Sequence, residues 1–143
     1  MRIPRRIAGS CLAVMVAALY AAAASSDVAD AAMKRDASAV RGLLQQKVDV
    51  NAPQADGSTA LHWAVHFDDV NMVEMLIGAA ANVKATNRFG VTPLALSCQN
   101  GNAAIVAKLI KAGADPNAAL SDLGETPLMM AARTGNVDTA RVL

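Results

Sequence analysis

Cysteine and aromatic side chains are scarce in this sequence. Its 143 residues include two Cys, one Trp, one Tyr and two Phe. Cys11 lies in an amino-terminal segment that we predict is removed, so Cys98 has no partner for an intramolecular disulfide bond. With few large rings and no covalent staple, the fold has to be stabilised by close packing of aliphatic side chains.

The first 24 residues have the layout of a secretory signal peptide. Arg2, Arg5 and Arg6 precede an apolar run from Cys11 to Ala24, and no acid accompanies them. The run ends in small residues that fit an A-x-A cleavage site, so we expect cleavage before Ser25. An uncleaved anchor is the alternative, but the run is shorter than the ~20 residues of a membrane-spanning helix. The mature chain is therefore predicted to be periplasmic or extracellular, with no membrane insertion after cleavage.

Charge of either sign is sparse, and the mature chain is almost balanced. The full sequence carries 13 basic and 12 acidic residues. Loss of the three leader arginines leaves ten basic residues against twelve acids, a formal charge of −2. A nearly neutral body argues against nucleic acid and against anionic membranes as partners.

One pattern returns three times at nearly constant spacing. Gly-x-Thr triplets occupy 57–59, 90–92 and 124–126, at intervals of 33 and 34 residues, and each is followed by Pro or Ala and then Leu. A second pattern recurs in step: VDVNA at 48–52, ANVKA at 81–85 and ADPNA at 114–118. Two patterns in one register predict a stack of equivalent units, each burying its apolar face against its neighbours.

These residues resemble the ankyrin repeat, in which D-x-x-G-x-T-P-L-H-x-A-A precedes a second helix and L-L-x-x-G-A-D-V-N-A. The resemblance extends from about Val28 to Leu143. It implies an all-α repeat solenoid, an ankyrin stack of helix-turn-helix units with β-hairpin-like loops. Since the family pattern would continue past Leu143, we expect the sequence to be a fragment. The expected segments are a signal peptide at 1–24, a capping repeat at 25–55, full repeats at 56–88 and 89–122, and a truncated repeat at 123–143.

Each unit marks its own helix boundaries. The threonine of each triplet is placed to cap the first helix, and Pro93 and Pro127 fit its first turn, where no amide donor is needed. Gly101 and Gly135 suit a left-handed turn between the two helices, a place that Asp68 takes in the preceding unit. The leucine of each unit is expected in the core, at Leu61, Leu94 and Leu128.

Several positions depart from the family pattern. Lys47 and Ala80 stand where the family has glycine, so the backbone at these turns is expected to be strained or differently shaped. Lys84 replaces the asparagine found at the corresponding positions 51 and 117. Cys98 takes a position of small residues between helices and is predicted to be a buried hydrophobic side chain.

The resemblance implies that a partner protein binds to the loop tips and to the exposed face of the first helices. Aromatic and apolar residues concentrated in such positions are typical of binding hot spots. Trp63 and Phe67 have an alternative role, which is to pack between repeats and extend the core. The predicted protein-binding residues are Trp63, His66, Phe67, Arg88, Phe89, Leu96, Gln99, Leu123, Met130 and Arg133.

No pattern in the sequence predicts catalysis, and no cofactor, metal or small-molecule substrate is expected. The mature chain has no phosphate-binding glycine loop, nucleophile elbow or convincing acid pair. His62 and His66 lie four residues apart, but His62 fills the histidine position of the family motif and no third ligand is near. The alternative function is a non-catalytic scaffold segment of a longer exported protein, whose enzymatic domain lies beyond residue 143.

Overall fold

Four helix pairs follow one another along the chain. The computed structural model describes residues 26–119 and 124–143, and no strand occurs within them. The predicted all-α repeat solenoid is therefore confirmed, and each predicted repeat segment contains one pair. The pairs are α2 (Asp27–Met33) with α3 (Ala37–Gln45), α4 (Ala60–His66) with α5 (Val70–Gly78), α6 (Pro93–Asn100) with α7 (Ala103–Lys111), and α8 (Pro127–Thr134) with α9 (Val137–Val142).

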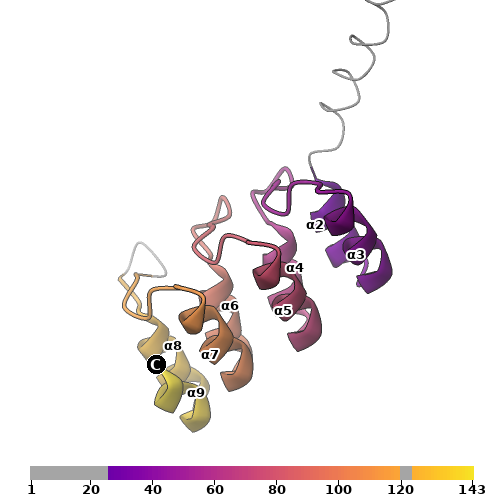
Figure 1. Ribbon diagram of the computed structural model, residues 1–143. Coiled ribbons are helices and arrows are strands. Elements are labelled where there is room, and N and C mark those ends of the chain that lie inside the picture. Colours follow the sequence, from indigo (N-terminus) through magenta and orange to yellow (C-terminus); the bar gives the residue numbers. More distant parts are fainter. Residues whose placement is uncertain (1–25, 120–123) are drawn as a thin grey trace, which may run out of the picture.

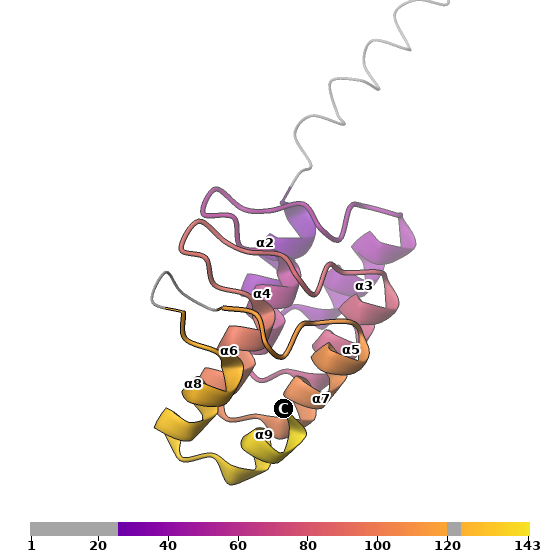
Figure 2. The ribbon, with the colours of Figure 1, turned by 90° about the vertical axis from the view of Figure 1, so that its left-hand side faces the viewer.

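The pairs stack side by side into two rows (Figures 1 and 2). The inner row consists of α2, α4, α6 and α8, and the outer row of α3, α5, α7 and α9. The loops between α3 and α4 and between α5 and α6 project from the same side of the stack (Figure 1). We call residues 53–58 the first finger and residues 86–91 the second finger. Both are closed by backbone hydrogen bonds in the same way, because Gln54 N–H donates to Ser58 O (2.9 Å) and Asn87 N–H donates to Val91 O (3.1 Å).

Side-chain caps fix where the helices begin. Thr92 Oγ1 accepts a hydrogen bond from Ala95 N–H (3.1 Å), and Thr126 Oγ1 accepts one from Met129 N–H (3.3 Å), as predicted. Such caps satisfy amide donors that have no partner inside the helix. The outer-row helices begin in the same way, at acid or amide caps that the sequence analysis did not single out: Asp36, Asp69, Asn102 and Asn136.

The core lies between the two rows and consists mainly of aliphatic side chains. Leu61 and Leu94 are 0% and 2% exposed, as predicted for the first helices. Leu76 and Leu109 face them from the outer row and are completely buried. Cys98 is also fully buried, and burial raises the pKa of its thiol to about 11, so the thiol stays protonated near neutral pH. Its predicted role as a small buried hydrophobic residue is confirmed.

The prediction for Leu128 was wrong. It occupies the same position as Leu61 and Leu94, yet it is 52% exposed, and Met129 beside it is 58% exposed. The helices that carry Leu61 and Leu94, α4 and α6, are each followed in the stack by another helix pair, whereas no described element lies beyond α8 and α9 on that side (Figure 2). Burial at this position depends on the neighbouring pair rather than on the residue type.

The turns within and after the pairs require left-handed backbone. Gly101 and Gly135 have φ values of 77° and 70°, as expected for glycine between two helices. Asp68 adopts the same conformation with φ 54°, and Lys47 and Ala80 do so with φ 58° and 64°. A side chain on left-handed backbone crowds the following carbonyl oxygen, so all three turns are strained, as predicted for Lys47 and Ala80.

An asparagine side chain bridges the first two turns by hydrogen bonds, and among the described residues this kind of bridge is missing at Lys84. Asn51 Nδ2 donates to Ala80 O (3.3 Å), and its Oδ1 accepts from Asn82 N–H (2.6 Å), which joins the first two pairs. Within residues 26–119 and 124–143, Lys84 forms no corresponding bridge to the turn that follows. A cavity of about 290 Å³ lies there, between residues 83–86 and 114–119. This turn therefore differs from the family pattern.

Ala80→Gly is expected to raise the free energy of unfolding by about 0.5–1 kcal/mol, because glycine accepts the left-handed conformation without steric cost. Urea denaturation followed by circular dichroism measures the change. Gly113→Ala is the matched control, since Gly113 has φ 101° and should lose stability on gaining a side chain. An unchanged midpoint for Ala80→Gly would show that the turn carries no strain.

Candidate protein-binding surface

A stripe of apolar side chains crosses the inner row. Trp63, Leu96 and Met130 occupy the same position on α4, α6 and α8, and each is half-buried against the core. Next to them, His66, Gln99 and Arg133 form a second, exposed row. The stripe therefore contributes to core packing and also leaves apolar surface open to a partner. Trp63 therefore packs against the core, as one of its two predicted roles requires, and it also keeps part of its surface exposed, as the other requires.

An aromatic cluster lies at the α4 end of this stripe. The rings of Trp63 and Phe67 are stacked, with centroids 6.0 Å apart and an angle of 24° between the planes. His66 meets Phe67 edge-on at 5.0 Å. The guanidinium of Arg35 lies 5.2 Å from the centroid of the Phe67 ring, a distance at which a cation is attracted to the ring face. The structure thus brings three predicted residues into direct contact.

A hydrogen-bond chain fixes the orientation of the indole ring. Trp63 Nε1–H donates to Gln54 Oε1 (2.7 Å), and Gln54 Nε2 donates to Asp30 Oδ1 (2.5 Å). The chain links α4 to the first finger and to α2. Because the polar edge of the indole is satisfied internally, the ring presents mainly apolar surface to an incoming partner.

The second finger carries Arg88 and Phe89 at its tip. Phe89 is 67% exposed, and the Arg88 guanidinium lies 4.9 Å from the centroid of its ring. Asn87 Oδ1 accepts hydrogen bonds from the backbone N–H groups of Phe89 and Val91, both at 3.0 Å, which closes the tip. An exposed aromatic ring on a closed, hydrogen-bonded tip is well placed for insertion into a partner.

The two fingers contact each other closely. Arg88 N–H donates to Asp56 O (2.9 Å). Gly57 has φ 82°, and a Cβ atom added there would lie 3.1 Å from backbone atoms of Asn87 and Arg88. A larger residue at Gly57 would therefore push the fingers apart.

His62 joins α4 to the second finger. Its Nδ1 lies 3.2 Å from Thr59 N and 2.9 Å from Thr59 Oγ1, and its Nε2 lies 2.9 Å from Val91 O. A backbone N–H can only donate, so Nδ1 accepts and Nε2–H donates to Val91 O. Burial lowers the pKa of His62, although the Val91 carbonyl and the Asp56 carboxylate oppose that shift. The ring therefore forms a structural bridge between repeats.

The remaining predicted residues are placed as follows. Arg133 lies on α8 and forms an ion pair with Glu125 at 3.7 Å, while Leu123 lies outside the described residues.

Sequence reasoning missed Arg35 and Gln54 as neighbours of the aromatic cluster. Arg35 stands 33 residues before Asp68, so it occupies the equivalent turn of the preceding repeat. Aligning the repeats could therefore have identified Arg35 as a residue of the turn that contacts Phe67.

None of the helices in residues 26–119 and 124–143 is long and apolar enough to cross a membrane. In the same part of the chain, no three His, Cys, Asp or Glu side chains gather closely enough to hold a metal ion.

The His62 bridge predicts a pH dependence of stability. The unfolded chain binds a proton at His62 near pH 6.5, whereas the folded chain binds it only at lower pH. The free energy of unfolding should be level above about pH 7. It should fall as the pH drops from 6.5 toward the lowered pKa, by at most about 1.4 kcal/mol per pH unit. Urea denaturation between pH 7.5 and 5.5 measures this slope. His62→Gln should flatten the slope of the free energy of unfolding against pH, whereas the exposed His66→Gln should not. Equal slopes in the two variants would contradict the conclusion that His62 causes the pH dependence.

Comparisons with known proteins agree with this architecture. A family model described as ankyrin repeats, in 3 copies, matches residues 28–119 and 71–143. The chain is 38% identical over 108 residues to Neurogenic locus notch homolog protein 1 of Xenopus tropicalis, which covers 75% of this chain and 4% of that protein. It is 38% identical over 106 residues to the protein of the same name from Danio rerio, covering 73% of this chain and 4% of that protein. It is also 38% identical over 73 residues to Palmitoyltransferase AKR1 of Lachancea kluyveri, covering 51% of this chain and 10% of that protein.

The chain thus spans a small part of each of these relatives. Ankyrin repeats generally mediate protein–protein interaction and are typically non-catalytic. The four stacked helix pairs, the threonine caps, the histidine bridge between repeats and the family match lead to one conclusion: this chain belongs to the ankyrin-repeat family.

Proposed function

We propose that this chain is an exported ankyrin-repeat module that binds a partner protein through its inner row and fingers. The observation that carries the proposal is the exposed ring of Phe89 together with the apolar stripe of Trp63, Leu96 and Met130. Large apolar side chains in partner-facing positions supply most of the energy in protein interfaces. Their fixed geometry lowers the ordering cost of binding.

Only the predicted signal peptide at residues 1–24 supports export. Its three arginines, its apolar run and its alanine-rich end are the features that a signal peptidase pathway recognises. We propose that the mature chain begins at Ser25 and resides in the periplasm or outside the cell. Amino-terminal sequencing of the protein recovered by osmotic shock tests both statements, and a chain that retains Met1 in the cytoplasmic fraction would contradict them.

The described residues also favour a binding role over a catalytic one. Cys98 is buried and protonated, and His62 is held by two hydrogen-bonding neighbours. Asp56 accepts from Ser58 N–H (2.9 Å), which lowers the pKa of its carboxyl and keeps it ionised. Each of these groups is engaged in holding a turn or a repeat boundary, so none is free to act as a nucleophile or a general base.

A second proposal is that the repeats are a scaffold segment of a longer exported protein. It is favoured by the coverage of the relatives, because the chain spans 4% to 10% of them and one is named a palmitoyltransferase. In that case the repeats bind while a domain beyond residue 143 carries an enzymatic activity. The coding sequence downstream of Leu143 decides between the two, since a stop codon directly after it would exclude the scaffold proposal.

Phe89→Ala is expected to weaken binding of the captured partner about 10- to 30-fold, because it removes an exposed aromatic ring from the second finger. Trp63→Ala should weaken binding to a similar degree, provided that its melting temperature shows a folded chain. The partner is first captured on the immobilised mature protein and identified by mass spectrometry, and its affinity is then measured by calorimetry.

Val137→Ala is the matched control for Phe89→Ala. Val137 is 61% exposed, but it lies on the outer row at α9. The control should bind like the original chain. Unchanged affinity in both Phe89→Ala and Trp63→Ala would contradict binding through the inner row and the fingers.

A further inference from the structure

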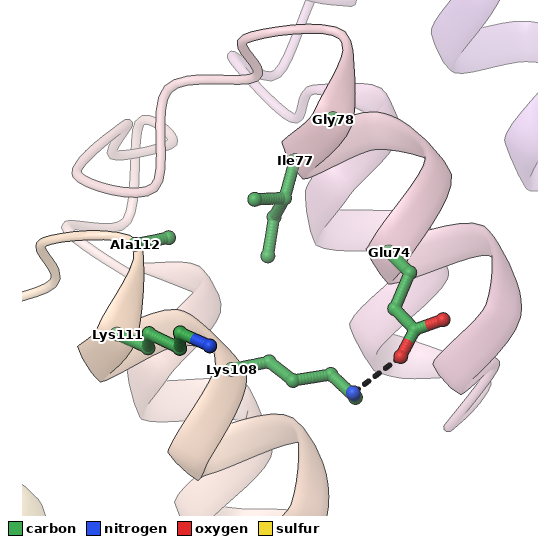
Figure 3. A pocket seen from close by; sticks show the side chains of 6 residues that line it. All are labelled: Glu74, Ile77, Gly78, Lys108, Lys111 and Ala112. Carbon is green, nitrogen blue, oxygen red and sulfur yellow. Dashed lines mark hydrogen bonds and ion pairs between the residues drawn. The ribbon is translucent and has the colours of Figure 1, made fainter.

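The outer row contains a groove that the proposed binding surface does not use. It lies between α5 and α7 of the outer row (Figures 2 and 3), whereas the Trp63 stripe belongs to the inner-row helices α4, α6 and α8. Its volume is about 410 Å³, within the range of sites that hold a small ligand or a few side chains. The lining residues are Glu74, Ile77, Gly78, Lys108, Lys111 and Ala112.

The walls of the groove are apolar. Ile77 points from α5 into the space between the helices, and Lys108 and Lys111 extend their aliphatic stems across it from α7 (Figure 3). Gly78 and Ala112 contribute little or no side chain, which leaves room at the helix ends. Lysine stems of this kind cover apolar surface while their ammonium groups stay at the rim.

The rim of the groove is positively charged. Lys108 forms an ion pair with Glu74 across the groove (Figure 3). Lys111 stands three residues further along the same helix, and no ion pair of Lys111 occurs among the described residues. One ammonium group therefore remains available at the edge of an apolar surface.

The charge of the groove lining points to the same partner chemistry. The lining carries two lysines, Lys108 and Lys111, against one acid, Glu74. Because Glu74 is paired with Lys108, the positive charge of Lys111 remains in excess at the groove. This local excess of positive charge favours an acidic partner.

We propose that this groove binds a short acidic segment of a partner protein, in which a leucine-sized side chain stands next to a carboxylate. The aliphatic side chain packs on Ile77 and on the lysine stems, and the carboxylate pairs with Lys111. A basic segment would meet the ammonium group of Lys111, which Glu74 does not neutralise, and is disfavoured by that charge. An uncharged segment would fill the groove but leave Lys111 without a counter-ion.

The test is a titration of the ¹⁵N-labelled chain with two peptides, acetyl-Leu-Glu-Leu-amide and acetyl-Leu-Gln-Leu-amide, at low salt. The Glu peptide should shift the amide signals of Ile77, Gly78 and Ala112. The Gln peptide and the Lys111→Gln variant should each bind about threefold more weakly, the size of one exposed ion pair. Added salt should reduce the difference between the peptides.

A steric plug provides the decisive variant. A Cβ atom at Gly78 meets no atom within 4 Å, so Gly78→Leu can be accommodated and places its side chain in the groove. It should abolish the shifts. Gly42→Leu is the matched control, because Gly42 also has open space, on α3 away from the groove, and this variant should bind normally.

Three outcomes would overturn the proposal. The first is equal binding of the two peptides with no effect of Lys111→Gln, and the second is binding that survives Gly78→Leu. The third is concentration-dependent self-association that shifts the same amides without peptide, which would make a second copy of the chain the occupant. Because neither Trp63 nor Phe89 lines the groove, loss of the proposed function in Phe89→Ala would leave this binding unchanged.

Discussion

Contact between successive helix pairs is the interaction on which the whole structure depends. A pair of six- to nine-residue helices is too short to be stable alone and cannot enclose its own apolar face. Leu61 and Leu94 are buried on helices that another pair follows, and Leu128 in the same position is exposed where no described pair follows. The fingers, the inner row and the outer groove all exist only because the pairs are held at a regular spacing.

The parts of the fold that the sequence predicted are those that repeat or that act locally. Threonine caps, first-turn prolines and glycines between helices follow from the preferences of single residues, and Thr92 and Gly101 take the expected roles. The periodic leucines Leu61 and Leu94 located the core of the second and third pairs. Lys47 and Ala80 were recognisable as strained because the pattern calls for glycine at both positions.

The missed features all require knowledge of a neighbour in space. The contact of Arg35 with Phe67, the bond from Trp63 to Gln54, and the groove between α5 and α7 join residues of different pairs or of distant turns. The burial prediction for Leu128 was wrong for the same reason, because the exposure of this side chain depends on the neighbouring helix pair. A single sequence shows which residues face the inner row, but it does not show which of them meet.

The fingers illustrate how close packing prepares a binding surface. Gly57 allows the backbones of the two fingers to touch, and the bond from Arg88 N–H to Asp56 O holds them together. The Phe89 ring is therefore presented by two joined loops rather than by one mobile loop, and a partner has little backbone to order on binding. The aromatic cluster around Trp63 has the same property, because its indole is held by Gln54.

The bridges between pairs change their chemistry along the stack. Asn51 joins the first two pairs and Asn136 joins the last two, through amide groups that take up no proton between neutral and mildly acidic pH. The middle boundary adds an imidazole, that of His62, to the amide bridge of Asn100. Through His62, acidity would therefore act on the middle boundary of the stack. That boundary is the one at which the first and second fingers meet, so the same site that sets their relative position also registers the acidity of the surroundings.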